Sequence, residues 1–166
     1  MPPPTAFISL GSNLGDSRRI LRDALVRLEG FSDDLVICSS FWQTSPVDCP
    51  PGSPPFVNAV VGLQMRAGET PESLLHALRE MEVEFGRTPK KVLNEPRRLD
   101  LDLISFGAEI RNTPELILPH PRAHLRRFVL QPLCEIAPEL VLPGQNRSVR
   151  QLLAGLPAGG MVILAK

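Results

Sequence analysis

The chain has 166 residues, of which 43% are hydrophobic, and its 18 basic residues are balanced by 18 acidic ones. This length and composition fit one compact domain with a substantial core, and the lack of net charge argues against bulk nucleic-acid binding. No apolar run reaches the roughly 18 residues that a membrane helix needs, and the N-terminus lacks the features of a signal peptide. We expect a single cytoplasmic domain over residues 1–166 without membrane contact, with residues 1–4 as an extended or disordered tail.

The first half of the chain alternates apolar segments of strand and helix length. An apolar run that ends at Gly11 predicts a strand, and Asp16 or Ser17 can cap a helix whose apolar positions recur every three or four residues. Gly30 is placed to end that helix, and a proline-rich loop at 44–55 separates two later strands. The predicted elements are a strand at 5–10, a helix from Asp16 or Ser17 to Gly30, a strand at 35–43 and a strand at 56–65.

The middle of the chain predicts a second helix. Thr70, Pro71 and Glu72 are typical of a helix start, with proline in the first turn and an acid near the positive end of the helix dipole. Apolar residues at helical spacing predict its buried face, and Gly86 follows as a stop signal. The apolar positions are Leu74, Leu75, Leu78, Met81 and Phe85, with Glu82 at the edge of this face.

The predicted order of elements, completed by a strand at 99–106, is strand, helix, strand, strand, helix, strand. This order predicts an α+β fold, a ferredoxin-like βαββαβ sandwich in which helices pack on an antiparallel sheet. The remainder after Gly107 is expected to form a C-terminal extension, with a helix over 128–136 that Pro132 interrupts.

The cysteines, Cys38, Cys49 and Cys134, are widely spaced and lack the spacing of a metal site or a redox motif. Their odd number and the expected cytoplasmic setting predict reduced thiols. Cys38 and Cys134 lie in apolar segments, so we expect them to serve in packing rather than as nucleophiles.

The most informative segment is the predicted strand that contains Asp100 and Asp102. Residues two apart on a strand share a face, so the two carboxylates point together while the neighbouring leucines point the other way. The same face is expected to continue into Ile104 and Phe106. Two carboxylates roughly 7 Å apart repel each other unless a cation lies between them, and a hard divalent cation fits this need. The alternative is an ordinary half-exposed strand with its polar face in water.

Two basic segments lie before and after this strand. Guanidinium groups bind phosphate oxygens through paired hydrogen bonds, so a magnesium-nucleotide site would explain why cations and carboxylates are juxtaposed. The second segment is equally compatible with a solvated basic turn. Phosphate-binding glycine motifs and an evident nucleophile are missing, which leaves transfer chemistry by positioning and charge. The first segment contains Arg87, Lys90, Lys91, Arg97 and Arg98, and residues 120–127 hold two histidines and three arginines.

In their order and spacing, five motifs resemble the 6-hydroxymethyl-7,8-dihydropterin pyrophosphokinases of folate biosynthesis. The resemblance covers roughly residues 5 to 140. It implies that ATP donates its β,γ-pyrophosphoryl group to the hydroxymethyl group of the dihydropterin, leaving AMP. It further implies a magnesium-dependent enzyme that acts as a monomer and does not bind nucleic acid. The motifs are Phe7 to Asp16, Phe56 to Ala59, Glu82 with Gly86 and Arg87, Pro96 to Asp102, and Pro119 to Phe128.

The resemblance also implies a role for individual residues. Two magnesium ions would bind at Asp100 and Asp102, and the pterin would lie between Phe56 and Phe128 with Asn58 at its rim. The residues expected to bind the nucleotide are Glu82, Arg87, Arg97, His120 and Arg126, of which Arg87, Arg97 and Arg126 join the two aspartates as catalytic residues. The pterin is further expected to contact Gly11, Asp100, Thr44, Ser45 and Pro46.

Two other functions remain open from the sequence. A ferredoxin-like module can bind RNA through basic loops, which predicts an affinity that falls steeply with salt, whereas ATP affinity would depend chiefly on magnesium. Zero net charge and the absence of RNA-stacking aromatic pairs on the central strands argue against it. A non-catalytic nucleotide sensor would yield no product at saturating substrates.

Overall fold

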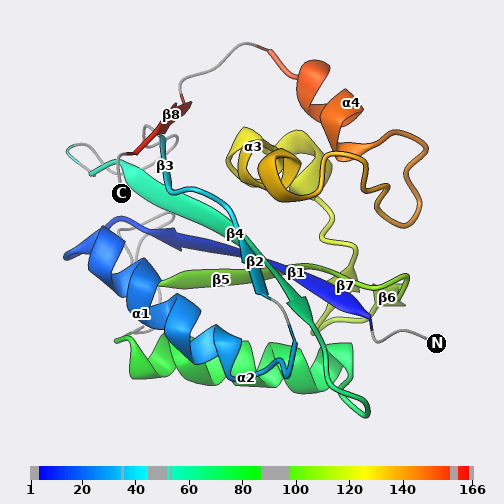
Figure 1. Ribbon diagram of the computed structural model, residues 1–166, viewed down its shortest axis with the longest axis horizontal. Helices are drawn as coiled ribbons and strands as arrows, with labels where there is room; N and C mark the ends of the chain where they lie inside the picture. The colour runs from blue at the N-terminus through cyan, green and yellow to red at the C-terminus, as the bar shows by residue number, and fades with distance from the viewer. Residues whose placement is uncertain are drawn as a thin grey trace.

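The computed structural model describes residues 4–34, 36–44, 52, 54–86, 98–157 and 161–164, which form a sheet with helices on both faces (Figure 1). The elements that build the predicted βαββαβ unit are β1 (Thr5–Ser12), α1 (Ser17–Glu29), β2 (Val36–Cys38), β3 (Trp42–Thr44), β4 (Phe56–Gln64), α2 (Pro71–Glu84) and β5 (Asp100–Phe106). The later elements are β6 (Arg111–Asn112), β7 (Ile117–Leu118), the short 3-10 helix η1 (Ala123–Leu125), α3 (Arg127–Ile136), α4 (Val149–Ala154) and β8 (Met161–Ile163).

The main sheet has the strand order β5-β1-β4-β3-β8, with β2 also paired to β4, and all these pairs are antiparallel. Strand β5, which carries the two aspartates, is therefore an edge strand next to the central β1. The predicted ferredoxin-like α+β fold is confirmed. The C-terminal part adds β8 at the opposite edge and a separate two-stranded sheet of β6 and β7.

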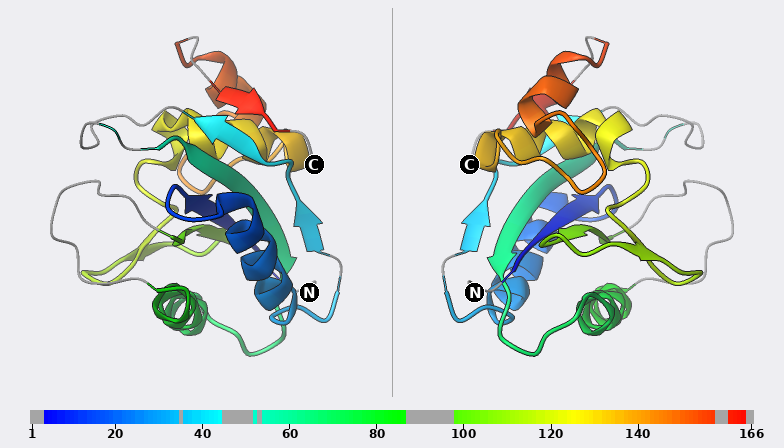
Figure 2. Two further views of the ribbon diagram at one scale, coloured as in Figure 1. Left: turned by 90° about the vertical axis from the view of Figure 1, so that its left-hand side faces the viewer. Right: turned by 90° about the vertical axis from the view of Figure 1, so that its right-hand side faces the viewer.

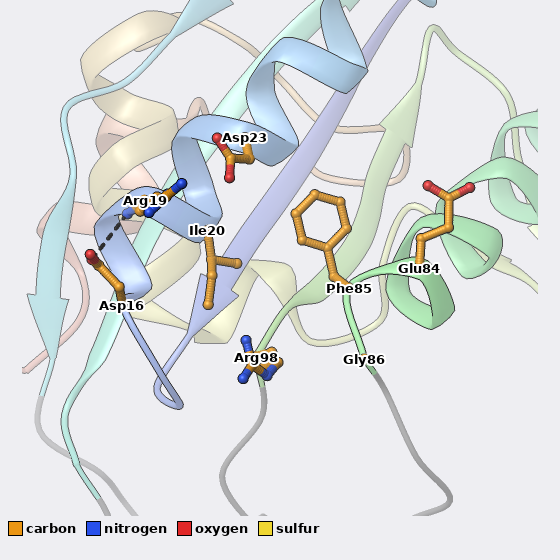
Figure 3. Close-up of a pocket in the computed structure, with 8 residues that line it drawn as sticks. All are labelled: Asp16, Arg19, Ile20, Asp23, Glu84, Phe85, Gly86 and Arg98. Atoms are coloured by element: carbon orange, nitrogen blue, oxygen red, sulfur yellow. Dashed lines mark hydrogen bonds between the residues drawn. The ribbon is translucent and has the colours of Figure 1, made fainter.

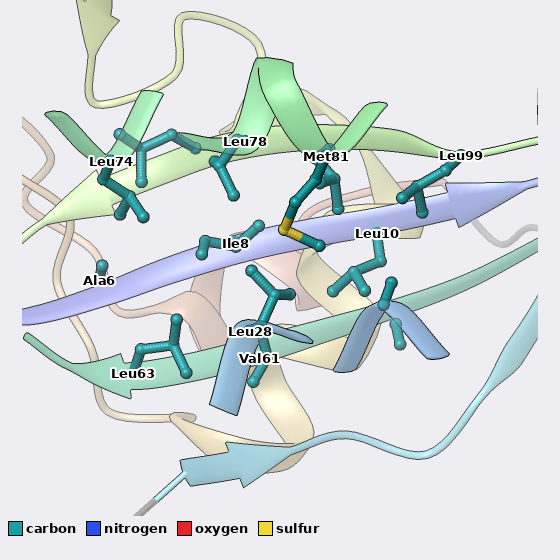
Figure 4. Packing of buried hydrophobic residues seen from close by; sticks show 14 of the residues in the cluster. Ala6, Ile8, Leu10, Leu28, Val61, Leu63, Leu74, Leu78, Met81 and Leu99 are labelled. Atoms are coloured by element: carbon teal, nitrogen blue, oxygen red, sulfur yellow. The ribbon is translucent and has the colours of Figure 1, made fainter. Parts of the chain in front are cut away.

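Helices α1 and α2 lie on one face of the sheet and α3 lies on the other (Figure 2). Helices α1 and α2 start at the predicted caps, where Asp16 accepts a hydrogen bond from the Arg19 N–H and Thr70 forms a reciprocal capping box with Ser73. Their apolar faces pack on β1, β4 and β5 (Figure 4). The C-terminal extension supplies α3, which covers part of the opposite face, and α4, which packs on α3, so the described residues form three layers.

The predicted strand at 35–43 is wrong as a single element, because the structure has two short strands with a break at 39–41. Polar side chains explain the break. The Ser39 hydroxyl accepts a hydrogen bond from the Val60 N–H at 2.9 Å, and Ser40 donates its N–H and hydroxyl to Glu135 of α3. Cys38 is exposed, so its expected packing role is wrong as well, whereas Cys134 is half-buried and packs against the apolar residues between α3 and the sheet. Cys49 lies outside the described residues.

A bulge in β5 corrects a second expectation. Leu103 pairs with Ile8 and Ser105 pairs with Phe7, so Ile104 is an extra residue in the ladder. Ile104 stays on the face of the aspartates, but Phe106 turns back into the core beneath α1 and α2, and the expected continuation of one face to Phe106 is wrong.

Two smaller predictions concern Pro132 and the N-terminal tail. Pro132 lies inside α3, which continues through it from Arg127 to Ile136, so the expected interruption is wrong. The Pro4 carbonyl accepts a hydrogen bond from the Met65 N–H at 2.9 Å, which attaches this residue of the expected tail to the sheet. Residues 1–3 lie outside the described residues.

Candidate active site

The strand register places three of the predicted site residues in one row across the sheet. Gly11 of β1 is paired with Asn58 of β4 on one side and with Asp100 of β5 on the other. In the next row on the same face, Ser9 is paired with Asp102. This face is the one that α3 covers further along, because Ile104 continues from the aspartates into the core beneath α3. Residues far apart in the sequence therefore meet on one end of this face.

The Asp100 carboxylate lies close enough to Asp102 to oppose its ionisation. Both are half-buried, and burial together with the nearby Asp100 carboxylate raises the pKa of Asp102 to about 6, although Arg79 and Arg126 oppose this shift. A divalent cation relieves such a conflict, and carboxylate oxygens are the ligands that magnesium prefers. Among the described residues no group of three or more potential ligands could hold a metal alone. The pair therefore fits magnesium that shares its coordination with substrate phosphates.

His120 is held beside the aspartates by its own backbone. Its N–H donates to the carbonyl of Ile104 at 2.8 Å, so the bulge in β5 provides the anchor for the second basic segment. The imidazole Nδ1 accepts a hydrogen bond from the Arg122 N–H at 3.1 Å. Burial, followed by the positive charges of Arg126 and Arg122, lowers the pKa of His120 to about 4. The ring is therefore neutral at pH 7 and carries its proton on Nε2, where it can donate to a ligand.

Arg126 connects the catalytic and pterin residues predicted from the sequence. It precedes α3, and its guanidinium carbon lies 5.2 Å from the centre of the Phe128 ring, a cation–π distance. It is also close enough to Asp102 and His120 to affect both of their pKa values. Arg126 thus places a positive charge between the two aspartates and the half-buried ring of Phe128.

The predicted pterin residues lie around Asn58, which is 4% exposed. Its Nδ2 donates to the Thr44 hydroxyl at 3.4 Å. A side chain at Gly11 would place its Cβ 3.2 Å from Asn58 Oδ1 and 3.8 Å from the ring of Phe56. Glycine at this position therefore keeps space open next to the amide and the ring. Phe56 and Phe128 are both half-buried, so each ring retains exposed surface.

Glu82 lies deeper than the sequence predicts. Its side chain is 1% exposed, and its Oε2 accepts a hydrogen bond from the Leu101 N–H at 2.9 Å. Arg79, which the sequence analysis did not select, donates to Glu82 Oε1 at 2.7 Å and to the Leu101 carbonyl at 2.9 Å. Its position three residues before Glu82 on a helix was the available signal. Four other predicted site residues, Ser45, Pro46, Arg87 and Arg97, lie outside the described residues and stay predictions.

A pocket of about 550 Å³ lies elsewhere, between α1, the end of α2 and Arg98 (Figure 3). It contains none of the predicted site residues. Three carboxylates and two guanidinium groups surround a single aromatic ring there, so it lacks the paired rings expected of a pterin site. Its lining residues are Asp16, Arg19, Ile20, Asp23, Glu84, Phe85, Gly86 and Arg98.

A ferredoxin-like sheet that presents paired carboxylates, a neutral histidine and an arginine has the features of a metal- and nucleotide-dependent transferase. The chain matches the model of the 7,8-dihydro-6-hydroxymethylpterin-pyrophosphokinase (HPPK) family over residues 7–138. The chain belongs to this family, as the sequence predicted. Its activity is pyrophosphoryl transfer from ATP to 6-hydroxymethyl-7,8-dihydropterin in folate biosynthesis.

Individual relatives agree with this assignment. The chain is 37% identical to a 2-amino-4-hydroxy-6-hydroxymethyldihydropteridine pyrophosphokinase of Pseudomonas aeruginosa over 93% of both chains. It is 41% identical to the enzyme of that name from Haemophilus influenzae over 86% of this chain and 87% of the relative. A Plasmodium falciparum HPPK-DHPS crystal structure with pteroate shares the fold, with a TM-score of 0.72, 14% identity and 91% of this chain covered. The chain spans 42% of that longer protein. Within the described residues, every helix is too short or too polar to cross a membrane.

Proposed function

We propose that Asp100 and Asp102 form the centre of the active site for this reaction. The observation that carries the proposal is the cross-strand register, which lines up Asn58, Gly11 and Asp100 on the face that also holds Asp102. Arg126 is close enough to lower the pKa of Asp102, and the Asp100 carboxylate is close enough to His120 to oppose the fall in its pKa. The acceptor and the polyphosphate would therefore meet over β1 and β5.

The carboxylates are proposed to hold two magnesium ions, which when bound would neutralise the polyphosphate and polarise the attacking hydroxyl group. As the β-phosphorus is attacked, negative charge develops on the transferred group and on the departing AMP, and fixed cations stabilise that charge. Arg126 is placed to supply such a charge. By resemblance, Arg87 and Arg97 would supply two more. The neutral His120 would donate from Nε2 to the nucleotide, and its low pKa makes it a poor proton acceptor at pH 7.

The pterin is proposed to lie between the rings of Phe56 and Phe128. A flat heterocycle with amide-like edges needs aromatic faces and paired donors and acceptors at its rim. Asn58 offers both a donor and an acceptor, and its contact with Thr44 fixes the orientation of its amide. The small Gly11 leaves room for the ligand beside Asn58.

The remaining proposals concern the setting. The enzyme is proposed to work as a monomer in the cytoplasm, where ATP is available, and not to bind nucleic acid, because its net charge is zero. Fluorescence of the single tryptophan, Trp42, can test whether the pterin or RNA binds near Asn58, because β3 pairs Trp42 with Asn58. Binding of pterin should change this emission, whereas RNA should leave it unchanged at physiological salt.

Two measurements test the proposed site. Incubation with ATP, magnesium and the dihydropterin should release AMP in proportion to the pterin consumed, and ADP would instead indicate transfer of a single phosphoryl group. Asp102→Asn should then abolish the magnesium dependence with which the protein binds a non-hydrolysable ATP analogue, measured by calorimetry. An Asp102→Asn protein that keeps this dependence would contradict the proposed metal site. A wild-type protein that binds both substrates and forms no product would be a nucleotide sensor.

A further inference from the structure

Among the described residues, no strand pairs with the edge of β5 that faces away from β1, and at Leu101 side chains bind this edge instead. An edge strand exposes backbone N–H and C=O groups that need partners. At Leu101 both backbone groups are hydrogen-bonded to side chains of α2. Glu82 accepts a hydrogen bond from the N–H and Arg79 donates one to the carbonyl, each at 2.9 Å. Arg79 also donates to Glu82 at 2.7 Å, which closes a ring of hydrogen bonds that we name the α2 clasp, formed by Arg79, Glu82 and the Leu101 backbone.

The two backbone groups that the α2 clasp holds belong to different peptide units. The Leu101 N–H lies in the peptide that follows Asp100, and the Leu101 carbonyl lies in the peptide that precedes Asp102. Because a peptide unit is planar, fixing these two groups fixes the planes that connect Leu101 to both aspartates. The spacing and direction of the two carboxylates therefore depend on α2.

We infer that Arg79 and Glu82 are positioning residues that set the geometry of Asp100 and Asp102 for magnesium. This inference rests on the proposed function, in which the two aspartates hold the metal. It gives Glu82 a role toward the strand in place of the expected contact with the nucleotide. It also assigns a role to Arg79, a residue whose side chain is 48% exposed and would otherwise resemble a surface cation.

The test compares Arg79→Met with Arg79→Lys. Methionine keeps much of the side-chain volume and removes both donated hydrogen bonds, whereas lysine can restore one of them. We expect Arg79→Met to lower kcat about tenfold, since small displacements of reacting groups are costly in rate, and to raise the half-saturating magnesium concentration for binding of the ATP analogue about fivefold. KM for the pterin should change less than about twofold, and Arg79→Lys should recover part of both losses.

Two matched controls separate positioning from general stability. Arg66→Met removes a surface arginine paired with Asp33, and Glu80→Gln makes the same change as Glu82→Gln at an exposed site on the same helix. Both controls should leave kcat and the magnesium requirement unchanged. Melting temperatures are recorded for every variant. If Glu82→Gln fails to fold because its carboxylate is buried, the half-exposed Arg79 carries the test.

Two outcomes would overturn the inference. An Arg79→Met enzyme with a lower melting temperature but unchanged kcat and magnesium requirement would show that the α2 clasp serves stability alone. A loss of analogue affinity at saturating magnesium with unchanged kcat would make Arg79 a nucleotide ligand. Failure of the proposed function would look different from both outcomes. Binding of the ATP analogue to the Asp102→Asn protein would then still depend on magnesium, and the α2 clasp would have no metal site to position.

Discussion

The two faces of the main sheet are built from the same strands and differ in what they hold. On the face toward α1 and α2, β1, β4 and β5 place apolar side chains that are buried completely, and Figure 4 shows how closely they pack. At the end of the other face that holds the site, the residues one position away are small, polar or acidic, whereas Val60 and Ile104 further along this face are apolar and lie in the core beneath α3. The neighbouring pairs are Leu10 and Gly11, Ala59 and Asn58, and Leu101 and Asp102. The difference teaches that a rigid apolar layer can hold an electrostatically unfavourable cluster one residue away.

The largest effect should come from the apolar face. Leu101→Ala deletes a fully buried side chain and should lower the free energy of unfolding by about 3 kcal/mol. The α2 clasp bonds Leu101 through its backbone, so the folded variant should keep kcat within about threefold of wild type. Urea unfolding and steady-state kinetics measure the two quantities. A variant with full stability and a tenfold lower kcat would contradict the division between the faces.

Substitution of the adjacent Asp102, on the other face of the sheet, should lower activity and leave stability unchanged. Asp102→Ala should lower kcat about 10²-fold or more, as removal of one electrostatic contributor typically does, without loss of stability at pH 8. The measurement is AMP formation at saturating substrates, with circular dichroism as a check of folding. An active Asp102→Ala enzyme would remove this aspartate from the mechanism.

The raised pKa of Asp102 predicts how activity depends on pH. Its carboxylate must be ionised to bind a metal, so at sub-saturating magnesium kcat/KM should fall about tenfold per pH unit below about pH 6. More magnesium should shift this acid limb to lower pH, because the metal competes with the proton. His120, with a pKa of about 4, should contribute no change between pH 5 and 8. An acid limb that does not move with magnesium would assign it to another group.

The smallest effect is the change in the free energy of unfolding that results from ionisation of Asp102. The pKa of Asp102 in the folded protein, about 6, lies above its ordinary value of 3.8, so ionisation destabilises the fold above pH 6 and has no cost below about pH 4. Asp102→Asn should therefore raise the free energy of unfolding by about 1 kcal/mol at pH 8, a discounted value for a half-buried group, and this gain should vanish near pH 4. The exposed Asp33→Asn is the control. A gain that is the same at both pH values would have another cause.

Sequence periodicity predicted the sheet with α1 and α2 and the shared face of Asp100 and Asp102, because the spacing of apolar residues along a strand or a helix is a local property. It did not predict that α3 covers the opposite face. It could not predict the bulge at Ile104, which depends on how β5 pairs with β1 and which supplies the carbonyl that anchors His120. The break at Ser39 and Ser40 was missed for a similar reason, since Glu135 lies 95 residues away from Ser40.

The α2 clasp shows the same limit at the site. Helical spacing placed Glu82 near the edge of a buried face, but nothing in that spacing shows that an edge strand lies within reach. The family resemblance selected Glu82 and gave no sign of Arg79, whose partner is a backbone carbonyl on another element. Contacts of side chains with distant backbone groups emerge only when the fold is known.

We propose that the sheet face that holds Asp100 and Asp102 binds the metal and both substrates. A crystal structure with a non-hydrolysable ATP analogue, magnesium and the pterin tests it most directly. Magnesium ions should lie on the carboxylate oxygens of Asp100 and Asp102, and the pterin should lie between Phe56 and Phe128. A nucleotide seated in the pocket beside Arg98 (Figure 3), with the two carboxylates bare of metal, would contradict it.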